Sequence, residues 1–288
     1  MSNISIFAKR AFLNTNPYSA FESKEKSYKG HGHLQRVSSM IRADQIVPRI
    51  GARLNPESGY ENDVCIYVKP MVRQGEDFKF EGKRAYLDII DGHNLGQLAL
   101  KHPEIGVIVC SQADYETMSG VIPNKIVLIP QHHCNFERVQ RNKSGVETIG
   151  IIGTKGAFSF LPVGLKITLA HRGIELIEFS DFFSRQDVID FYQKIDIQIV
   201  WRPYKKLLSN PLKIVNAASF GIPTIALDEP AFEELNSYYI PVKDFDDLLF
   251  KLDVIKDDSD IYQRFSDRCF GKAEEYHIDN IAKLYKNL

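Results

Sequence analysis

The strongest constraint on the fold is the regular alternation of short apolar segments with stretches of helical periodicity. The apolar segments lie at Asn3–Phe12, Asp63–Lys69, Tyr86–Ile90, Gly106–Cys110, Lys125–Ile129, Thr148–Ile152, Ile174–Phe179, Ile195–Trp201, Thr224–Leu227 and Tyr239–Val242. Strands that are apolar throughout are typical of parallel sheets, whose crossover helices cover both faces. The sequence therefore predicts an α/β protein with doubly wound parallel sheets.

A polar stretch divides this alternation into two halves. Gln131–Gly145 lacks periodicity and is rich in turn-forming residues, and the alternation restarts after Val146. A length of 288 residues allows two domains. We therefore expect a first Rossmann-like domain over residues 1–140 and a second one over residues 141–270, with a cleft between their sheets.

Composition excludes several classes of protein. The net charge of −1 argues against binding to a nucleic-acid backbone, because such proteins are normally basic. No apolar run reaches the roughly 18 residues that a membrane span needs, and the first residues lack the order of a signal peptide. The four scattered cysteines are expected to be reduced thiols. We expect a cytoplasmic protein, with peripheral membrane contact left open.

The stretch from Leu208 to Glu234 predicts a helix followed by a turn and a strand. Ser209 or Asn210 suits the N-cap, Pro211 suits the first helical position, and Gly221 suits a left-handed C-terminal residue. Lys213 breaks the local rule, because the positive end of the helix dipole disfavours a cation in the first turn. It is either a phosphate ligand or a lysine that extends into water.

Polar residues follow many of the predicted strands. They are Asp91, His93, Gly153, Thr154, Lys155, Asp181, Arg202, Asp228 and Glu229. In open α/β sheets, ligands bind beyond the carboxyl ends of the strands. A further glycine-rich turn, Gly30–His33, precedes a predicted helix and could approach an anion or a sugar. The convergence of these residues predicts a ligand site in the cleft.

Several segments also carry a resemblance to a known family. They are Ile129–His132, Ile151–Gly153, Asn210–Ala218, Gly221–Thr224 and Tyr276–Tyr285. These segments resemble the linker, first nucleotide-domain strand, Gly-x-Pro helix and strand, and final helix of GT-B glycosyltransferases of the group-one, retaining (family 4-like) kind. The resemblance implies a GT-B fold in which a C-terminal helix, within residues 271–288, packs back on the first domain.

The resemblance has two departures. The family usually carries a glutamate at each end of a seven-residue spacer before Gly-x-Pro. Leu208 and Asn216 occupy these two positions here. The retaining and inverting mechanisms therefore both stay open, as does a non-catalytic domain.

The expected donor site combines cations with backbone N–H groups. The phosphate candidates are Arg202, Lys213, Lys205, Gly153, Thr154 and Lys155. Arg202 can bind a phosphate through two nitrogens, although a surface arginine is the alternative. Fixed cations would stabilise the charge that builds on a departing diphosphate.

Other residues are expected to contact the base and the sugars. Asp181 and Phe182, with Asn216, are candidates for the nucleobase and ribose, while Asp228, Glu229 and Gly32 are candidates for the sugar. The alternatives are a helix cap at Asp181 and solvated loop carboxylates at Asp228 and Glu229.

Asp91 and His93 are the best acid–base pair, with His31 and His33 as rivals. Asp91 could equally be a structural helix cap. A metal site at His132 and His133 is disfavoured, so we expect neither a metal nor a cofactor. The resemblance implies a hexosyltransferase-like enzyme of glycan biosynthesis that uses a nucleotide-diphosphate sugar, such as a UDP- or GDP-sugar, as co-substrate. Its acceptor would be a carbohydrate or glycoconjugate. The alternatives are a nucleotide-sugar epimerase of the same fold and a non-catalytic nucleotide-sugar-binding protein.

Overall fold

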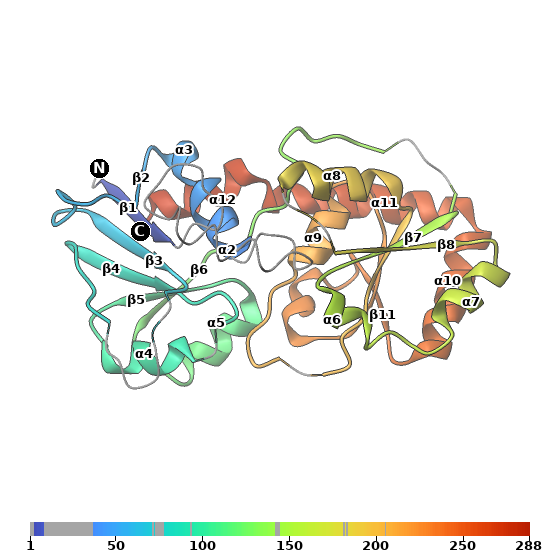
Figure 1. The fold of residues 1–288 in the computed structure, drawn as a ribbon, viewed down its shortest axis with the longest axis horizontal. Coiled ribbons are helices and arrows are strands. Elements are labelled where there is room, and N and C mark those ends of the chain that lie inside the picture. Colours follow the sequence, from blue (N-terminus) through green and yellow to red (C-terminus); the bar gives the residue numbers. More distant parts are fainter. Residues whose placement is uncertain are drawn as a thin grey trace.

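The protein consists of two parallel-sheet domains that lie side by side along its longest axis (Figure 1). The computed structural model describes residues 3–8, 37–70, 72, 78–92, 94–141, 145–180, 182, 184–204 and 206–288. Both sheets are parallel throughout, which confirms the predicted fold class.

The first sheet has the strand order β2-β1-β3-β4-β5-β6. Its strands are β1 (Ile4–Ala8), β2 (Arg53–Leu54), β3 (Val64–Val68), β4 (Arg84–Asp88), β5 (Gly106–Val109) and β6 (Lys125–Leu128). β3 and β5 are buried along their whole length, as their continuous apolar sequences predict. β2 is a two-residue edge strand that lacks the length and apolar pattern needed for prediction.

The second sheet has the strand order β11-β10-β9-β7-β8. Its strands are β7 (Thr148–Ile152), β8 (Glu175–Phe179), β9 (Ile197–Val200), β10 (Thr224–Leu227) and β11 (Ile240–Val242). The chain leaves β7 toward β8 on one side and continues to β9 on the other. The carboxyl end of β7 is therefore a topological switch point, where ligands of open α/β sheets bind.

Helices connect these strands. The first domain contains α2 (Val37–Ser39), the π-helix η2 (Met40–Asp44), α3 (Val47–Ile50), α4 (Leu95–Lys101) and α5 (Gln112–Ser119). The second contains α6 (Lys155–Phe158), α7 (Leu165–His171), α8 (Arg185–Lys194), α9 (Leu212–Ala218), the 3₁₀-helix η3 (Pro230–Leu235), α10 (Phe245–Asp257) and α11 (Ser259–Ala273). Short α6, α7 and η3 were not predicted, because few turns give little periodicity.

The last helix, α12 (Ile278–Lys286), belongs to the core of the first domain. It follows the 3₁₀-helix η4 (Glu274–Tyr276). Its buried side chains Ile278, Ile281 and Tyr285 pack in one cluster with β1 and β3, while α11 packs against α9 of the second domain. Burial of each such side chain contributes about 1.5–3 kcal/mol. The chain thus crosses back, as the resemblance implied (Figure 1).

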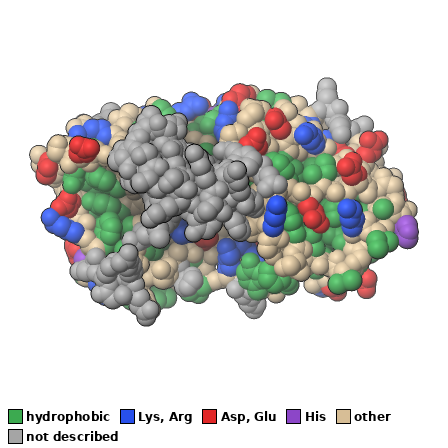
Figure 2. All heavy atoms as spheres, viewed as in Figure 1, with side chains coloured by type: hydrophobic (Ala, Val, Ile, Leu, Met, Phe, Trp, Pro, Cys, Tyr) green, Lys and Arg blue, Asp and Glu red, His purple; other side chains and the backbone are tan. Residues whose placement is uncertain are grey.

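The surface shows mixed charge. Lysine and arginine side chains are interspersed with aspartate and glutamate on the face drawn in Figure 2, in keeping with the near-zero net charge. Among the described residues, no helix has the length and apolar character needed to cross a membrane.

Candidate functional site

Two adjoining cavities lie where the carboxyl ends of the two sheets face each other. The larger, the charged cleft cavity, has a volume of about 460 Å³ and is lined from both domains by Lys69, Asp91, Gly153, Thr154, Trp201, Arg202, Lys206 and Lys213, among others. The smaller, the apolar pocket, has a volume of about 170 Å³. Gly153, Phe182 and Lys213 line both cavities, so the two form one continuous site.

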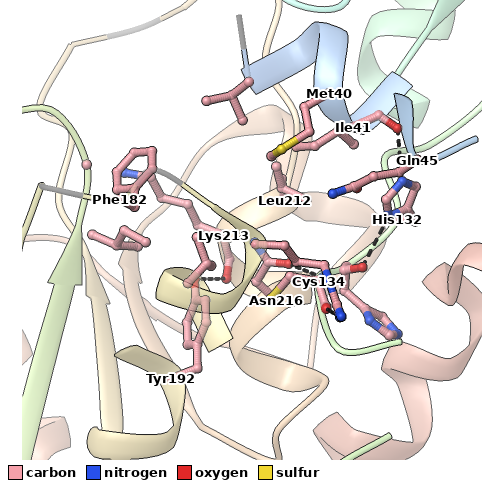
Figure 3. Close-up of a pocket in the computed structure, with 16 residues that line it drawn as sticks. Met40, Ile41, Gln45, His132, Cys134, Phe182, Tyr192, Leu212, Lys213 and Asn216 are labelled. Atoms are coloured by element: carbon pink, nitrogen blue, oxygen red, sulfur yellow. Dashed lines mark hydrogen bonds between the residues drawn. The ribbon is translucent and has the colours of Figure 1, made fainter. Parts of the chain in front are cut away.

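The apolar pocket lies between the π-helix and the second domain. Figure 3 shows Met40 and Ile41 on one side, with Phe182 and Tyr192 from the second domain on another. Leu212 and Lys213 contribute from the start of α9. The predicted base-contacting residue Phe182 therefore does line a cavity of the cleft.

Lys213 and Gly153, two residues predicted to bind the donor phosphates, lie close together at the switch point. A Cβ atom built on Gly153 would lie only 3.3 Å from Lys213 Nζ. The Lys213 side chain is open to the cleft, yet protein surrounds its ammonium group on several sides. This desolvation, together with the charges of Arg202 and Lys206, lowers the pKa of Lys213 to about 8, although Glu229 opposes the shift. Two neighbouring cations make this a favourable place for an anion.

The guanidinium group of Arg202 forms an ion pair with the carboxylate of Glu229. Its Nε donates to Glu229 Oε1 over 2.8 Å, and its Nη2 contacts Glu229 Oε2 and donates to Ser209 Oγ over 2.7 Å. Glu229 is buried and its oxygens accept from Arg202 and Ser209, so its predicted contact with a sugar stays a prediction. A phosphate at Arg202 would have to share this guanidinium with Glu229.

Asp91 lies in the charged cleft cavity, at the end of the segment that follows β4. Its carboxylate accepts from Lys69 Nζ over 2.5 Å and lies 3.5 Å from Lys206 Nζ. Burial favours the neutral acid, but the bond to Lys69 and the charges of both lysines prevail and lower the pKa of Asp91. Asp91 is thus a stable anion, better suited to holding a hydroxyl or a cation than to accepting a proton.

Asn216 binds the interdomain linker. Its Oδ1 accepts from the backbone N–H of Cys134 over 2.8 Å, and its side chain also bonds to Tyr192. Tyr192 in turn donates to Gln198 Oε1 over 2.8 Å. The residue that replaces one family glutamate therefore connects the linker to the core of the second domain.

Leu208 stands at the other position where the resembled family carries a glutamate, and it is not among the residues lining either cavity. It is buried in the first domain, in the cluster that holds Leu87, Leu95 and Leu98. The next residue, Ser209, donates its backbone N–H to Asp114 Oδ1 of α5 over 3.2 Å. Residues 206–210, which we name the docking segment, therefore anchor the second domain to the first.

The sequence did not predict that Asp114 and Glu234 connect the two domains. Burial raises the pKa of Asp114 to about 7, because hydrogen bonds from Ser209 and Ser111 only partly offset desolvation. Glu234 also joins the domains, but here the first domain is the donor: the backbone N–H of Gln112 donates to Glu234 over 2.7 Å. The signal at Asp114 was an acid in the first turn of a short helix, which normally indicates capping, and Glu234 lies near the end of η3 with no such signal.

The predicted helix start on the docking segment needs correction. Pro211 is the N-cap, and Leu212 is the first helical residue. The Asn210 side chain still accepts from the backbone N–H of Leu212 over 3.2 Å, whereas Ser209 joins Arg202 and Glu229. Gly221 has the predicted left-handed conformation, with φ of 70°.

The remaining predicted residues divide into three groups. Thr154 lines the charged cleft cavity and is the N-cap of α6, which Lys155 begins. Asp228 is not among the residues lining either cavity, and its Oδ1 accepts from the Tyr239 hydroxyl over 2.6 Å. Six others lie outside the described residues: His31, Gly32, His33, His93, Asp181 and Lys205.

Metal ligation was the disfavoured reading of the histidine pair. The ring nitrogens of His132 contact the carbonyl oxygens of Ile41 and His133, and burial lowers the pKa of His132 to about 4. Burial likewise lowers the pKa of His133 to about 3. Within the described part of the chain, no group of three or more histidine, cysteine or acidic residues is placed to hold a metal ion.

Comparison with known proteins identifies the fold. No protein-family model matches the chain, and no curated protein matches it by sequence. Solved structures do match. HepE (Alr3699) from Anabaena, in a complex with UDP and glucose, has a TM-score of 0.63 at 9% identity, and the match covers 100% of this chain and 99% of that one.

Two further structures agree. A glycosyltransferase from Rickettsia africae has a TM-score of 0.56 at 11% identity, with 99% of this chain and 97% of that chain covered. The glycosylation-associated Gap123 complex from Streptococcus agalactiae has a TM-score of 0.54 at 12% identity over 94% of this chain. The chain spans 61% of that longer relative. Despite this low identity, the chain therefore has the two-domain GT-B fold of glycosyltransferases.

Proposed function

We propose that this protein is a glycosyltransferase that moves a sugar from a nucleotide-diphosphate sugar to a hydroxyl acceptor. The observation that carries the proposal is the Lys213 ammonium group, held against Gly153 at the switch point of the second sheet. In this reaction the acceptor oxygen bonds to the anomeric carbon while the bond from that carbon to the diphosphate breaks, and the hydroxyl proton of the acceptor passes to the departing diphosphate. Lys213 would stabilise the diphosphate that leaves, without a metal or cofactor.

The diphosphate would lie in the charged cleft cavity, beside the backbone of Gly153 and Thr154. Arg202 becomes a second phosphate ligand in this proposal if the incoming charge draws the guanidinium away from Glu229. The nucleobase would extend toward Phe182 in the apolar pocket. UDP and UDP-glucose are the first ligands to test, because HepE binds UDP and glucose.

Calorimetric titration with UDP, GDP, ADP, UDP-glucose and GDP-mannose tests this assignment. We expect one nucleotide family to bind and Lys213→Ala to weaken that binding by tenfold or more, equivalent to about 1.4 kcal/mol. Lys194→Ala is the matched control, because Lys194 is exposed at the end of α8 and is not among the residues lining either cavity. Unchanged affinity in Lys213→Ala would remove the basis of the proposal.

A second candidate is a protein that binds a nucleotide sugar without transferring it. The engagement of Arg202 by Glu229 favours this reading, because a catalytic cation is more effective when it is free to meet the charge that develops. The two functions differ in one measurement. Release of free nucleotide diphosphate from a bound donor, with an acceptor panel present, supports the transferase, whereas tight binding without release supports the second candidate.

A further inference from the structure

Two aromatic side chains stand exposed at the charged cleft cavity. Phe160 follows α6, and Tyr204 follows β9, so the two come from separate segments of the second domain. Their ring centroids lie 5.2 Å apart at an interplanar angle of 60°. Phe160 is 47% exposed and Tyr204 is 45% exposed, although both line the cavity. Adjacent exposed aromatics at a cavity point to a binding surface.

A third aromatic ring extends this surface. Trp201, the single tryptophan of the chain, directly follows β9 and also lines the charged cleft cavity. Trp201 is half-buried, and it packs against the core of the second domain. The second domain therefore contributes an aromatic wall, which we define as Phe160, Tyr204 and Trp201.

The charged groups of the same cavity complement this wall. Asp91 is held there as an anion between Lys69 and Lys206. A carboxylate accepts hydrogen bonds from hydroxyl groups, and an ammonium group donates to them. The cavity thus combines aromatic faces with strong hydrogen-bonding groups of both kinds. Its volume of about 460 Å³ falls in the range of roughly 300–1,000 Å³ that is usual for ligand sites.

A saccharide has both matching surfaces. One face of a pyranose ring consists of C–H bonds, which make favourable contacts with the electron-rich face of an aromatic ring. The edge of the ring carries hydroxyl groups that both donate and accept. A purely apolar ligand would leave Asp91 and its lysines without new partners, so the charges of the cavity disfavour a lipid tail.

We propose that Phe160 and Tyr204 form the stacking surface for a sugar ring of a carbohydrate acceptor, with Asp91 binding its hydroxyl groups. This inference rests on the proposed glycosyltransferase function and names the acceptor class. It gives the two exposed rings a role in acceptor binding only. Loss of either ring therefore weakens binding of the acceptor and leaves binding of the nucleotide unchanged.

A glycan array, followed by titration of the best-bound saccharide against Trp201 fluorescence, tests the inference. We expect the wild-type protein with UDP to bind at least one saccharide. Phe160→Ala and Tyr204→Ala should each weaken that binding about tenfold. Phe160→Tyr and Tyr204→Phe should retain it, because both keep a ring. Phe250→Ala is the control, since Phe250 is 67% exposed on α10 and is not among the residues lining the cavity.

The outcomes separate the two proposals. UDP affinity that is unchanged in both alanine variants shows that they still fold and that the two rings do not contribute to binding of the nucleotide. An inference of a saccharide surface is overturned if the wild type binds no glycan, or if the alanine variants bind as well as the wild type. It is also overturned if these variants instead lose binding to phosphatidylcholine–phosphatidylglycerol vesicles. Absence of nucleotide binding with glycan binding retained would refute the transferase alone.

Discussion

At the scale of single residues, the buried ion pair of Arg42 and Asp88 joins three parts of the first domain. Arg42 Nε donates to Asp88 Oδ2 of β4 over 2.7 Å, and its Nη1 donates to the carbonyl oxygens of Ile129 and Pro130 at 2.8 and 2.9 Å. The guanidinium also lies 5.3 Å from the ring centroid of Tyr285 in α12. Arg42 therefore connects the π-helix to β4, to the start of the linker and to the last helix.

Replacement of this arginine should destabilise the protein strongly. Arg42→Met leaves the Asp88 carboxylate buried without its cation, and we expect the free energy of unfolding to fall by about 3–5 kcal/mol. Urea denaturation monitored by circular dichroism measures the change. Arg138→Met is the control, because Arg138 and its partner Glu274 are both about half exposed. A loss no larger than that of the control would contradict the bridging role.

The carboxylate of Glu229 partly neutralises Arg202 and so weakens its attraction for a bound anion. Glu229→Gln keeps the size of the side chain and removes its charge, so the guanidinium becomes available to an anion. We expect the affinity for UDP to rise several-fold, as measured by calorimetry. Glu233→Gln, an exposed neighbour in η3, should change little. Weaker nucleotide binding in Glu229→Gln would show that Glu229 supports the site.

Lys213 and Asp91 stood out in the sequence as candidates, whereas the contacts among the candidate residues could not be predicted from it. A lysine in the first turn of a helix is anomalous by a local rule, and an aspartate after a strand is recognisable by position. The pairing of Arg202 with Glu229 joins positions 27 residues apart. Such partners depend on how loops fold over the sheet, and no periodicity encodes them.

At the scale of secondary-structure elements, the docking segment carries the contact between the domains. Leu208 is buried in the first domain, while its neighbour Leu207 is 70% exposed. Leu208→Ala should lower the free energy of unfolding by about 2–5 kcal/mol, because it leaves a cavity among packed leucines. Leu207→Ala is the matched control, and urea denaturation compares the two. Equal small effects would refute the docking of this segment.

The same burial predicts that an acid introduced at Leu208 would not restore the family motif. Its side chain is buried in the core of the first domain and is not among the residues lining either cavity. The sequence resemblance places Leu208 at the position of a family glutamate, but it does not show that this segment packs against the first domain. The place of the Leu208 side chain is therefore set by packing between the domains.

Asp114 makes the docking of this segment dependent on pH. Its pKa is about 7 in the folded protein and 3.8 when exposed, so the folded state holds the proton more tightly. The stability contributed by the neutral acid is full below about pH 4 and is lost as the pH rises through about 7. Glu234 and Asp91 act on Asp114 with like charge and reinforce this direction, while Ser209 and Ser111 oppose it.

We therefore expect the wild type to lose thermal stability relative to Asp114→Asn between pH 5 and pH 8. The asparagine keeps an oxygen for the Ser209 amide and cannot ionise. Melting temperatures of the two proteins across that range, at constant ionic strength, provide the measurement. Parallel curves would show that Asp114 carries no proton in the folded state at these pH values.

At the scale of the whole molecule, the fold could be predicted far better than the assembly of the site. The strands are short apolar runs whose burial on both faces almost dictates a parallel sheet, and the crossover connections constrain its handedness. The cleft, in contrast, depends on connections between the domains at the linker near Asn216, at the docking segment, at α12 and between Gln112 and Glu234. Each uses contacts between residues distant in sequence, which local patterns do not specify.

These connections give the cleft a fixed geometry around its two cavities. The linker is held by Asn216, and Arg185 of α8 donates to the carbonyl oxygen of Cys134 over 2.7 Å. On the opposite side, Gln112 and Glu234 join α5 to η3. The charged cleft cavity therefore lies between contacts that join the two domains, and its lining comes from both domains.

The placement of α12 has a consequence for biosynthesis. The core that contains β1 also contains Ile278, Ile281 and Tyr285 of α12, so segments that flank the whole second domain share one hydrophobic interior. A nascent chain on the ribosome can close its second sheet while the first still lacks this helix. The first domain therefore matures last, although its strands emerge from the exit tunnel first.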